Sequence, residues 1–175
     1  MSDDFLFLPE NPRDDALVEA LHAAAFGPGR FTRAAARIRE QGPHAVDLSL
    51  AAWRGNALAG SVRLTPIAAG AGGALLLGPL AVAAPFVGMG VGRALVRRAV
   101  ERAAQAGETL VILIGDEPYY GPLGFARIPR GQAAMPLPVD PDRFLAHEIA
   151  PGALAAFAGM VTHAARAVAP AAVLA

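Results

Sequence analysis

LLLGPLAVAAPFVGMGVGRALVRR, residues 75–98, joins an apolar strand to a helix through a glycine-rich turn. The strand is expected over Leu75–Val82, and the helix begins near Val91. Three glycines lie in the turn between them: Gly88, Gly90 and Gly92. Glycine lets the backbone adopt positive φ and approach a ligand closely. The first N–H groups of a helix have no partner within it and lie at its partly positive end. The stretch therefore predicts an anion site, with phosphate as its natural occupant.

The spacing of these glycines narrows the choice of phosphate ligand. The dinucleotide pattern G-x-G-x-x-G fails because Arg93 stands at the third glycine position, and the Walker pattern G-x-x-x-x-G-K-[ST] is absent. A tight strand-to-helix turn without any ligand remains an alternative at this point. Arg97 and Arg98 follow on the helix, and we interpret both as mainly solvated, although one of them could reach a phosphate.

The composition is that of a globular protein and excludes several kinds of chemistry. The 175 residues, 54% of them hydrophobic and 17% charged, suffice for one domain with a core. A formal net charge of +0 gives no sign of a nucleic-acid or anionic-membrane partner. The absence of cysteine excludes disulfides and thiolate catalysis, and it fits a reducing compartment, so we expect a cytoplasmic protein. The apolar run Phe5–Leu8 is too short for a signal peptide.

One uncharged stretch has the length of a membrane span. Residues 64–92 contain no charged side chain, and about 20 apolar residues suffice to cross a bilayer. Prolines at positions 66, 79 and 85, together with several glycines, would interrupt a helix there repeatedly. Two strands and a loop explain the stretch better than a membrane helix, so no membrane partner is expected.

The first 65 residues predict a strand, two helices and a hairpin. Asn11 and Pro12 are typical of an N-cap and a first helical position, and Gly27 is suited to end that helix. The expected elements, in chain order, are a strand at Phe5–Leu8, a helix from Pro12 to Gly27, a short basic helix near Phe31–Gln41, and a hairpin of Val46–Leu50 with Ala57–Thr65 around Gly55-Asn56.

Residues 66–149 predict two parallel strands joined by a crossover helix. The Ala68–Gly73 loop leads into a strand whose Gly78-Pro79 pair indicates a bulge or splay, because proline lacks the N–H donor. A strand, a crossover helix and a second buried strand form a right-handed unit with parallel strands. The expected elements are strands at Ala74–Ala83 and Thr109–Ile114, a helix at Val91–Ala106, a turn or short helix at Pro118–Gly121, and strands at Phe125–Ile128 and Arg143–Ile149. We expect one domain, 1–175, with a core at about 3–150 and a C-terminal extension, 151–175, whose structure is left open.

Several motifs in one order resemble the GNAT N-acetyltransferases, and in particular their YhbS-like subgroup. Residues 87–92, VGMGVG, are similar to the acetyl-CoA pyrophosphate loop Q/R-x-x-G-x-G/A, with Val87 in place of the usual Gln or Arg. Tyr120, Gly124 and Phe125 match the pattern Y-x-x-x-G-F. The segments GPGRF at 27–31, GSVRLTP at 60–66, LGPLAV at 77–82 and GDEPYY at 115–120 add to the likeness, which covers about Arg13 to Ile149.

The resemblance implies a fold and a cofactor site. The fold is α/β (α+β): a GNAT-like acyl-CoA N-acyltransferase fold with a mixed β-sheet that is splayed to admit the pantetheine arm and flanked by helices. Acetyl-CoA is the implied co-substrate, and no metal is expected. Its pyrophosphate would lie against the loop, and its pantetheine arm along the preceding strand, where the implied contact residues are Leu80, Ala81, Val82, Val87, Gly88, Met89, Gly90, Val91, Gly92 and Arg93.

Tyr120 is the candidate general acid. The resemblance implies this role, and a phenol with a pKa near 10 can protonate a thiolate whose conjugate acid has a pKa near 8.5. Without the resemblance, packing against the core would be the simpler interpretation of Tyr120. We interpret Tyr119 as a packing residue or a wall of the acceptor site. No general base is assigned: Asp116 and Glu117 suit a turn cap equally well, and His22 and His44 are more simply structural. His147 and His163 have no partner at metal-ligand spacing and do not indicate a metal.

Two functions remain from this reasoning. The first is an acetyl-CoA-dependent N-acetyltransferase acting by direct attack of an amine, either a small molecule or a protein amine, with a homodimer left open. The alternative is a non-catalytic acyl-CoA-binding or sensing domain on the same fold, because fold does not determine function. Val87 and the unassigned base keep this alternative open.

Overall fold

A computed structural model describes residues 5–167. Residues 1–4 and 168–175, which include the acidic N-terminus and the end of the expected C-terminal extension, lie outside the described residues. The strands are β1 Leu6–Pro9, β2 Leu50–Arg54, β3 Ala57–Gly70, β4 Gly72–Val82, β5 Leu110–Ile114, β6 Ala126–Arg127, β7 Ala133–Ala134, β8 Phe144–Glu148 and β9 Phe157–His163. The helices are α1 Asp15–Phe26, α2 Ala34–Arg39, α3 Val91–Gln105, α4 Glu117–Tyr120 and α5 Ala164–Ala167.

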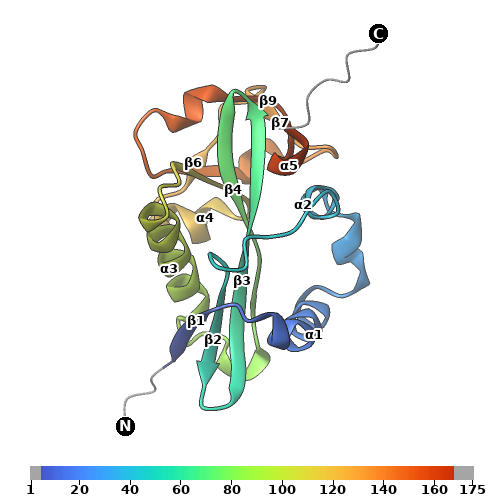
Figure 1. The fold of residues 1–175 in the computed structure, drawn as a ribbon, viewed down its shortest axis with the longest axis vertical. Helices are drawn as coiled ribbons and strands as arrows, with labels where there is room; N and C mark the ends of the chain where they lie inside the picture. Colours follow the sequence, from blue (N-terminus) through green and yellow to red (C-terminus); the bar gives the residue numbers. More distant parts are fainter. Residues whose placement is uncertain (1–4, 168–175) are drawn as a thin grey trace.

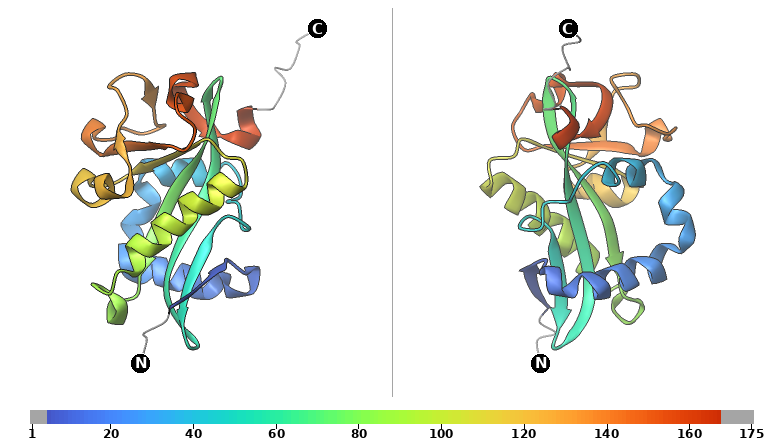
Figure 2. Two further views of the ribbon diagram at one scale, coloured as in Figure 1. Left: turned by 90° about the vertical axis from the view of Figure 1, so that its left-hand side faces the viewer. Right: turned by 45° about the vertical axis from the view of Figure 1, so that its right-hand side comes forward.

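The strands form one mixed sheet in the order β1-β2-β3-β4-β5-β8-β6, and β9 pairs with β3 and with β7. β4 and β5 pair in parallel, and every other pair of neighbours in this order is antiparallel. The long β3–β4 hairpin runs through the centre, with α3 on one side and α1 and α2 on the other (Figure 1). The left view of Figure 2 shows the same layers with α3 crossing in front of the strands and the N-terminal helices behind them. The predicted mixed sheet flanked by helices is confirmed.

Two apolar clusters hold these layers together. Leu75 and Leu77 of β4 pack on the α3 side with Leu95, whereas Leu76 packs on the other side with Ile38 of α2. The side chains of β5 alternate between the same two clusters, so β5 is covered on both faces. This explains why residues 110–114 form a continuous apolar run. No helix within residues 5–167 is long and apolar enough to cross a membrane.

The predicted irregularity at Gly78-Pro79 is confirmed. The register of β3 and β4 shifts between Val62 and Leu64, opposite this pair. On its other edge β4 pairs with β5 only at Leu75 and Leu76. The two parallel strands therefore separate just before Gly78, and the sheet opens at its middle.

Two sequence predictions were wrong. Residues 46–48 form a turn, in which the N–H of Ser49 donates to Ala45 O at 2.9 Å, so the hairpin strand is Leu50–Arg54 rather than Val46–Leu50. The expected loop at 68–73 is paired strand, with the turn confined to the end of the hairpin, because Ala68 pairs with Gly73 and Ala69 with Gly72.

The C-terminal extension, whose structure the sequence left open, adds a strand to the sheet. β9 pairs with the far end of β3, where Ile67 lies opposite His163 and Ala68 opposite Thr162. Phe157 and Val161 of β9 are fully buried in the cluster on the α2 side. Phe157–His163 is therefore part of the sheet, although its alanine- and glycine-rich surroundings gave no clear strand pattern.

Candidate functional site: a glycine loop and an opening in the sheet

The glycine loop has the geometry of an anion site. β4 ends at Val82, a short 3-10 turn covers Ala84–Phe86, and α3 begins at Val91. Gly88 has φ +83° and Gly90 has φ +80°, and a β-carbon added at either residue would meet nothing within 4 Å. Both glycines thus supply the left-handed backbone and leave the space in front of the loop open.

The N–H groups of this loop are free to bind an anion. Those of Gly88, Gly90, Val91, Gly92 and Arg93 have no hydrogen-bond acceptor within residues 5–167. They cluster at the N-terminus of α3, where the helix dipole adds partial positive charge. The first bond of the helix is donated by Ala94 to Gly90 O at 3.0 Å. This arrangement fits a pyrophosphate held by backbone donors.

The other expected loop contacts differ in their surroundings. The side chains of Val87 and Met89 are exposed, at 67% and 41%. Gly92 is needed for packing, because a β-carbon there would lie 2.7 Å from the Tyr119 hydroxyl. The guanidinium carbon of Arg93 lies 5.5 Å from the centre of the Tyr119 ring. Further along α3, Arg98 stacks over Phe7 and both it and Arg97 are exposed, in agreement with the solvated interpretation.

The edge of β4 beside the loop is also free. The N–H of Ala83 donates to Ala59 O of β3 at 2.8 Å, so the backbone groups of Ala83 and Ala81 face β3. Successive residues of a strand direct these groups to opposite edges. Those of Leu80 and Val82 therefore face the edge that β5 has left. An extended amide chain can pair with such an edge as an added strand would.

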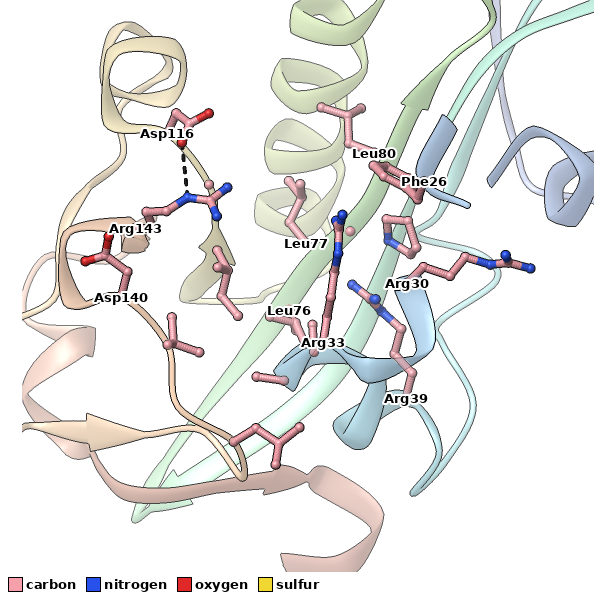
Figure 3. A pocket seen from close by; sticks show the side chains of 18 of the residues that line it. Phe26, Arg30, Arg33, Arg39, Leu76, Leu77, Leu80, Asp116, Asp140 and Arg143 are labelled. Atoms are coloured by element: carbon pink, nitrogen blue, oxygen red, sulfur yellow. Dashed lines mark hydrogen bonds and ion pairs between the residues drawn. The ribbon is translucent and has the colours of Figure 1, made fainter. Parts of the chain in front are cut away.

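A cavity of about 670 Å³ lies where β4 and β5 separate, and we name it the main cavity. One wall is β4 from Leu76 to Leu80, a second is the end of β5 with Tyr120, and a third is α2 with its preceding turn. Figure 3 shows Arg33 and Arg39 reaching from the α2 segment toward the β4 side chains, while Asp116 and Arg143 pair on the opposite wall. The cavity thus connects the free edge of β4 with the helices of the N-terminal half.

Tyr120 lines the main cavity from the end of β5. Its ring lies against Gly115, where an added β-carbon would come within clashing distance of the ring, and it packs edge-on against Tyr119 and Phe125. No hydrogen-bond partner exists for its hydroxyl among residues 5–167, so the group is available to a ligand. Burial, with the neighbouring Tyr119 and Asp116, raises the pKa of Tyr120 to about 12. The phenol is therefore protonated throughout the neutral range.

The acidic residues near Tyr120 are engaged in surface ion pairs. Asp116 lies 3.1 Å from Arg143, and Glu117 pairs with Arg127. The structure therefore gives these two carboxylates a role in fixing the turn after β5. Burial also raises the pKa of Tyr119.

A partly buried ionic cluster, in which Arg63 and Glu10 are the buried members, lies under the N-terminal half. Arg63 of β3 binds three carboxylates, those of Glu10, Asp15 and Glu19, at 2.6, 2.7 and 2.5 Å. Burial would raise the pKa of Glu10, but His44 and Arg63 lower it to about 2. The cluster ties the end of β1 and two turns of α1 to the centre of the sheet.

The histidines are held by structural contacts. His22, 2% exposed, has its Nε2 3.0 Å from Ser61 Oγ. Burial, with the charge of Arg63, lowers the pKa of His22 to about 4, so the ring is neutral near pH 7. His163 packs by hydrogen bonding to Pro43 O at 2.9 Å, and His147 lies against Phe125. Within residues 5–167 no group of three or more His, Asp or Glu side chains is arranged to hold a metal ion.

A second cavity of about 300 Å³, which we name the side cavity, adjoins the main cavity. Arg30, Arg39 and Pro79 line both cavities, and Thr65 and His44 line the side cavity. Sequence reasoning did not single out Arg39, Arg63 or Thr65. For Arg63 a signal existed, since it is the one charge in the apolar run 57–70. For Arg39 there was none, because Arg33 and Arg37 on the same helix look equivalent in sequence.

Comparisons with known proteins agree with this geometry. The sequence model of the acetyltransferase (GNAT) family matches residues 15–125. A GNAT family N-acetyltransferase (YhbS) from Escherichia coli, solved in complex with CoA, superposes with a TM-score of 0.78 at 23% identity, over 93% of this chain and 91% of that one. A GNAT family acetyltransferase from Brucella melitensis in complex with acetyl-CoA superposes with a TM-score of 0.65 at 24% identity, over 85% of this chain and 90% of that one. Comparison with curated proteins found no match. The family match covers more than half of the sequence and includes the glycine loop and Tyr120, and the chain therefore belongs to the GNAT acetyltransferase family.

Proposed function

We propose that this protein transfers the acetyl group of acetyl-CoA to the amine of a small molecule or protein. The observation that carries the proposal is the continuity of three features: the free N–H groups of the glycine loop, the free edge of β4 at Leu80 and Val82, and the main cavity with Tyr120 at its end. A diphosphate, an amide-containing arm and a reactive end follow one another in CoA in this order. The family match and the likeness to two structures solved with CoA or acetyl-CoA support the same cofactor.

The loop and the strand would hold the cofactor through backbone atoms. Gly88, Gly90, Gly92 and Arg93 would donate N–H groups to the pyrophosphate, with Val87, Met89 and Val91 completing the loop. Leu80 and Val82 would pair with the amides of the pantetheine arm, and Ala81 between them faces β3 and keeps the strand in place. Because backbone donors carry this binding, Val87 does not need to supply the side chain that Gln or Arg supplies elsewhere in the family.

Tyr120 would act as the general acid. Acetyl-CoA supplies a thioester, and attack by a neutral amine forms the C–N bond, breaks the C–S bond and releases the thiol. Tyr120 would donate the proton of its hydroxyl to the departing sulfur, the amine nitrogen would lose one proton to solvent, and water would reprotonate the phenolate. With a pKa of about 12, Tyr120 is a weaker acid than an ordinary phenol, so it would transfer its proton only as negative charge develops on the sulfur.

The test is release of free thiol from acetyl-CoA in the presence of a panel of primary amines. The expected result is release that depends on the amine, with one N-acetylated product per thiol. Binding of CoA without turnover of any amine would contradict the proposal and support the alternative, an acyl-CoA-binding or sensing domain. A matched incubation without acceptor measures hydrolysis, which must be subtracted before either conclusion is drawn.

A further inference from the structure

Arg39 is a cation without a counterion at the boundary of the two cavities. Its side chain lies between α2 and β4, and an added β-carbon at Gly78 would lie 3.0 Å from its Nη2. The guanidinium therefore reaches the point where β4 leaves β5 (Figure 3). Within residues 5–167, Arg39 makes no ion pair, and its Nε is buried without a hydrogen-bond partner. A buried donor of this kind carries the cost of desolvation with no compensating contact.

The carboxylates around the side cavity are already engaged by other arginines. Glu19 is bound by Arg63, and Glu40 is bound by Arg37 at 2.9 Å. The charged groups that act on Arg39 are Arg63 and Arg33, both of them cations. Burial, with these like charges, lowers the pKa of Arg39 to about 10, which leaves it charged near pH 7. Its surroundings therefore favour an anion from outside the chain.

The side cavity offers a second unused polar group. The Oγ1 of Thr65 is buried and has no hydrogen-bond partner within the described residues, and Thr65 and Arg39 line the same cavity. A hydroxyl can donate one hydrogen bond, and a guanidinium can donate two parallel ones to a planar carboxylate. A volume of about 300 Å³ admits a small organic group rather than a single ion.

We propose that the acceptor of this enzyme carries a carboxylate, which binds to Arg39 and Thr65 in the side cavity while its amine projects into the main cavity. The inference rests on the proposed acetyl transfer and specifies its substrate class as amino acids or closely related amino carboxylates. Arg39 acts as the binding residue for the carboxylate. Its contact with the Gly78 region places that carboxylate next to the separation of β4 and β5, where an amine a few bonds away meets the end of the cofactor cavity.

The experiment compares acceptors that differ only in the carboxylate. The standard amino acids, each beside its carboxamide, are assayed for thiol release from acetyl-CoA, and kcat/KM is measured for each pair. A carboxamide has the more acidic ammonium group and so more free amine at neutral pH, which favours it if the carboxylate is not recognised. The expected result is a preference of at least about tenfold for the acid of the best pair, as for a charge-assisted hydrogen bond. Equal rates or a preference for the amides would overturn the proposal.

Variants assign that preference to the side cavity. Arg39→Gln is expected to raise the KM of the acid about 10- to 100-fold and to bring the acid-to-amide ratio close to one, with the KM of acetyl-CoA unchanged. Arg37→Gln on the same helix is the matched control, because Arg37 is exposed and paired with Glu40, and its ratio should equal that of the wild type. Thr65→Val, which removes only the unpaired hydroxyl, should lower the ratio a few-fold. An unchanged ratio in Arg39→Gln, with the preference intact, would overturn the proposal.

Two further measurements separate failure of this inference from failure of the proposed function. If no acceptor is turned over, titration of N-acetylated amino acids and their amides into the CoA-saturated protein decides: tighter binding of the acids that Arg39→Gln abolishes supports the anion site without catalysis, and equal binding overturns it. If succinyl-CoA is used in preference to acetyl-CoA, and Arg39→Gln reverses that preference, the carboxylate belongs to the acyl donor. The acceptor proposal is then overturned while acyl transfer stands.

Discussion

The glycine loop and the side cavity present different parts of the chain to a ligand. The loop offers free backbone N–H groups from five residues between Gly88 and Arg93, and its geometry depends on two glycines with positive φ. The side cavity uses side chains that arrive from α1, α2 and β3, such as His22, Arg39 and Thr65. A backbone site tolerates many sequences and suits a cofactor that a whole family shares. A side-chain site changes with single substitutions and suits the acceptor, which differs from one enzyme to another.

The largest effect is expected at Tyr120, which lines the main cavity that adjoins the side cavity. Tyr120→Phe keeps the ring and its packing and removes only the hydroxyl, so kcat should fall about 10²- to 10⁴-fold while CoA affinity stays within a few-fold. The loss should appear equally in kcat and kcat/KM, because the contact exists only in the transition state. Steady-state kinetics on the best acceptor measure this.

Tyr119→Phe is the matched control, since the Tyr119 hydroxyl lies against Gly92, and its effect should stay below about tenfold. The pKa of Tyr120, raised to about 12, adds a pH signature. A general acid works in its protonated form, so Tyr120 should cause no fall in rate below about pH 11. A near-normal kcat in Tyr120→Phe, or a basic limb near pH 9 that this variant alone abolishes, would contradict the assignment.

The N-terminal half should depend strongly for its stability on the ionic cluster around Arg63. Arg63→Met leaves Glu10 buried without its main partner and frees two further carboxylates, so the free energy of unfolding should fall by about 3–5 kcal/mol. Urea denaturation at pH 7 measures it. The control Arg37→Met breaks only an exposed pair and should cost less than about 1 kcal/mol. Similar losses in the two variants would show that the cluster is not a main support of this half.

Acid should weaken the same region in two steps. The pKa of His22 is lowered from 6.5 to about 4, so the unfolded chain binds a proton that the folded one does not, and stability falls as pH drops from about 6.5 to 4. The pKa of Glu10 is lowered from 4.5 to about 2, so its contribution is present above 4.5 and is lost below it. Each step is on the order of 3 kcal/mol.

Denaturation at a series of pH values from 7.5 to 4 measures the first step, and the variant His22→Gln identifies it. Glutamine can still bond to Ser61 but does not titrate in this range, so the slope of stability against pH should flatten between 6.5 and 4. An identical slope in wild type and variant would place the acid sensitivity elsewhere.

The contrast also explains what the sequence could predict. The loop, the helix Val91–Gln105 and the buried strand depend on local patterns, namely glycine spacing, helical periodicity and a short apolar run, and their positions were predicted closely. Gly78-Pro79 likewise marks the opening through the chemistry of proline. These features together with the family motifs sufficed to predict the fold and the position of the glycine loop.

The remaining features depend on contacts between distant segments. Val46–Leu50 alternates like a strand, but it is residues 50–53 that find partners on both edges, in β1 and β3. Phe157–His163 becomes a strand because the long β3 offers it an edge. Arg39 differs from Arg37 only in which way α2 is turned, and that is set by the packing of Ile38 into the core. No local pattern encodes such choices.

The most direct test of the account is the effect of CoA on thermal unfolding of the wild type, Gly90→Val and Arg97→Ala. With CoA at about 100 times its dissociation constant, linkage gives the wild type about 2.7 kcal/mol of added stability, and nicotinamide dinucleotide at the same concentration gives none. Gly90→Val should lose the CoA-dependent shift, because its side chain would fill the space before the loop, whatever strain its φ of +80° adds to the free protein. Arg97→Ala should keep the shift. An unchanged melting temperature of the wild type in CoA, or a larger loss in Arg97→Ala than in Gly90→Val, would contradict the claim that the backbone of this loop binds the cofactor.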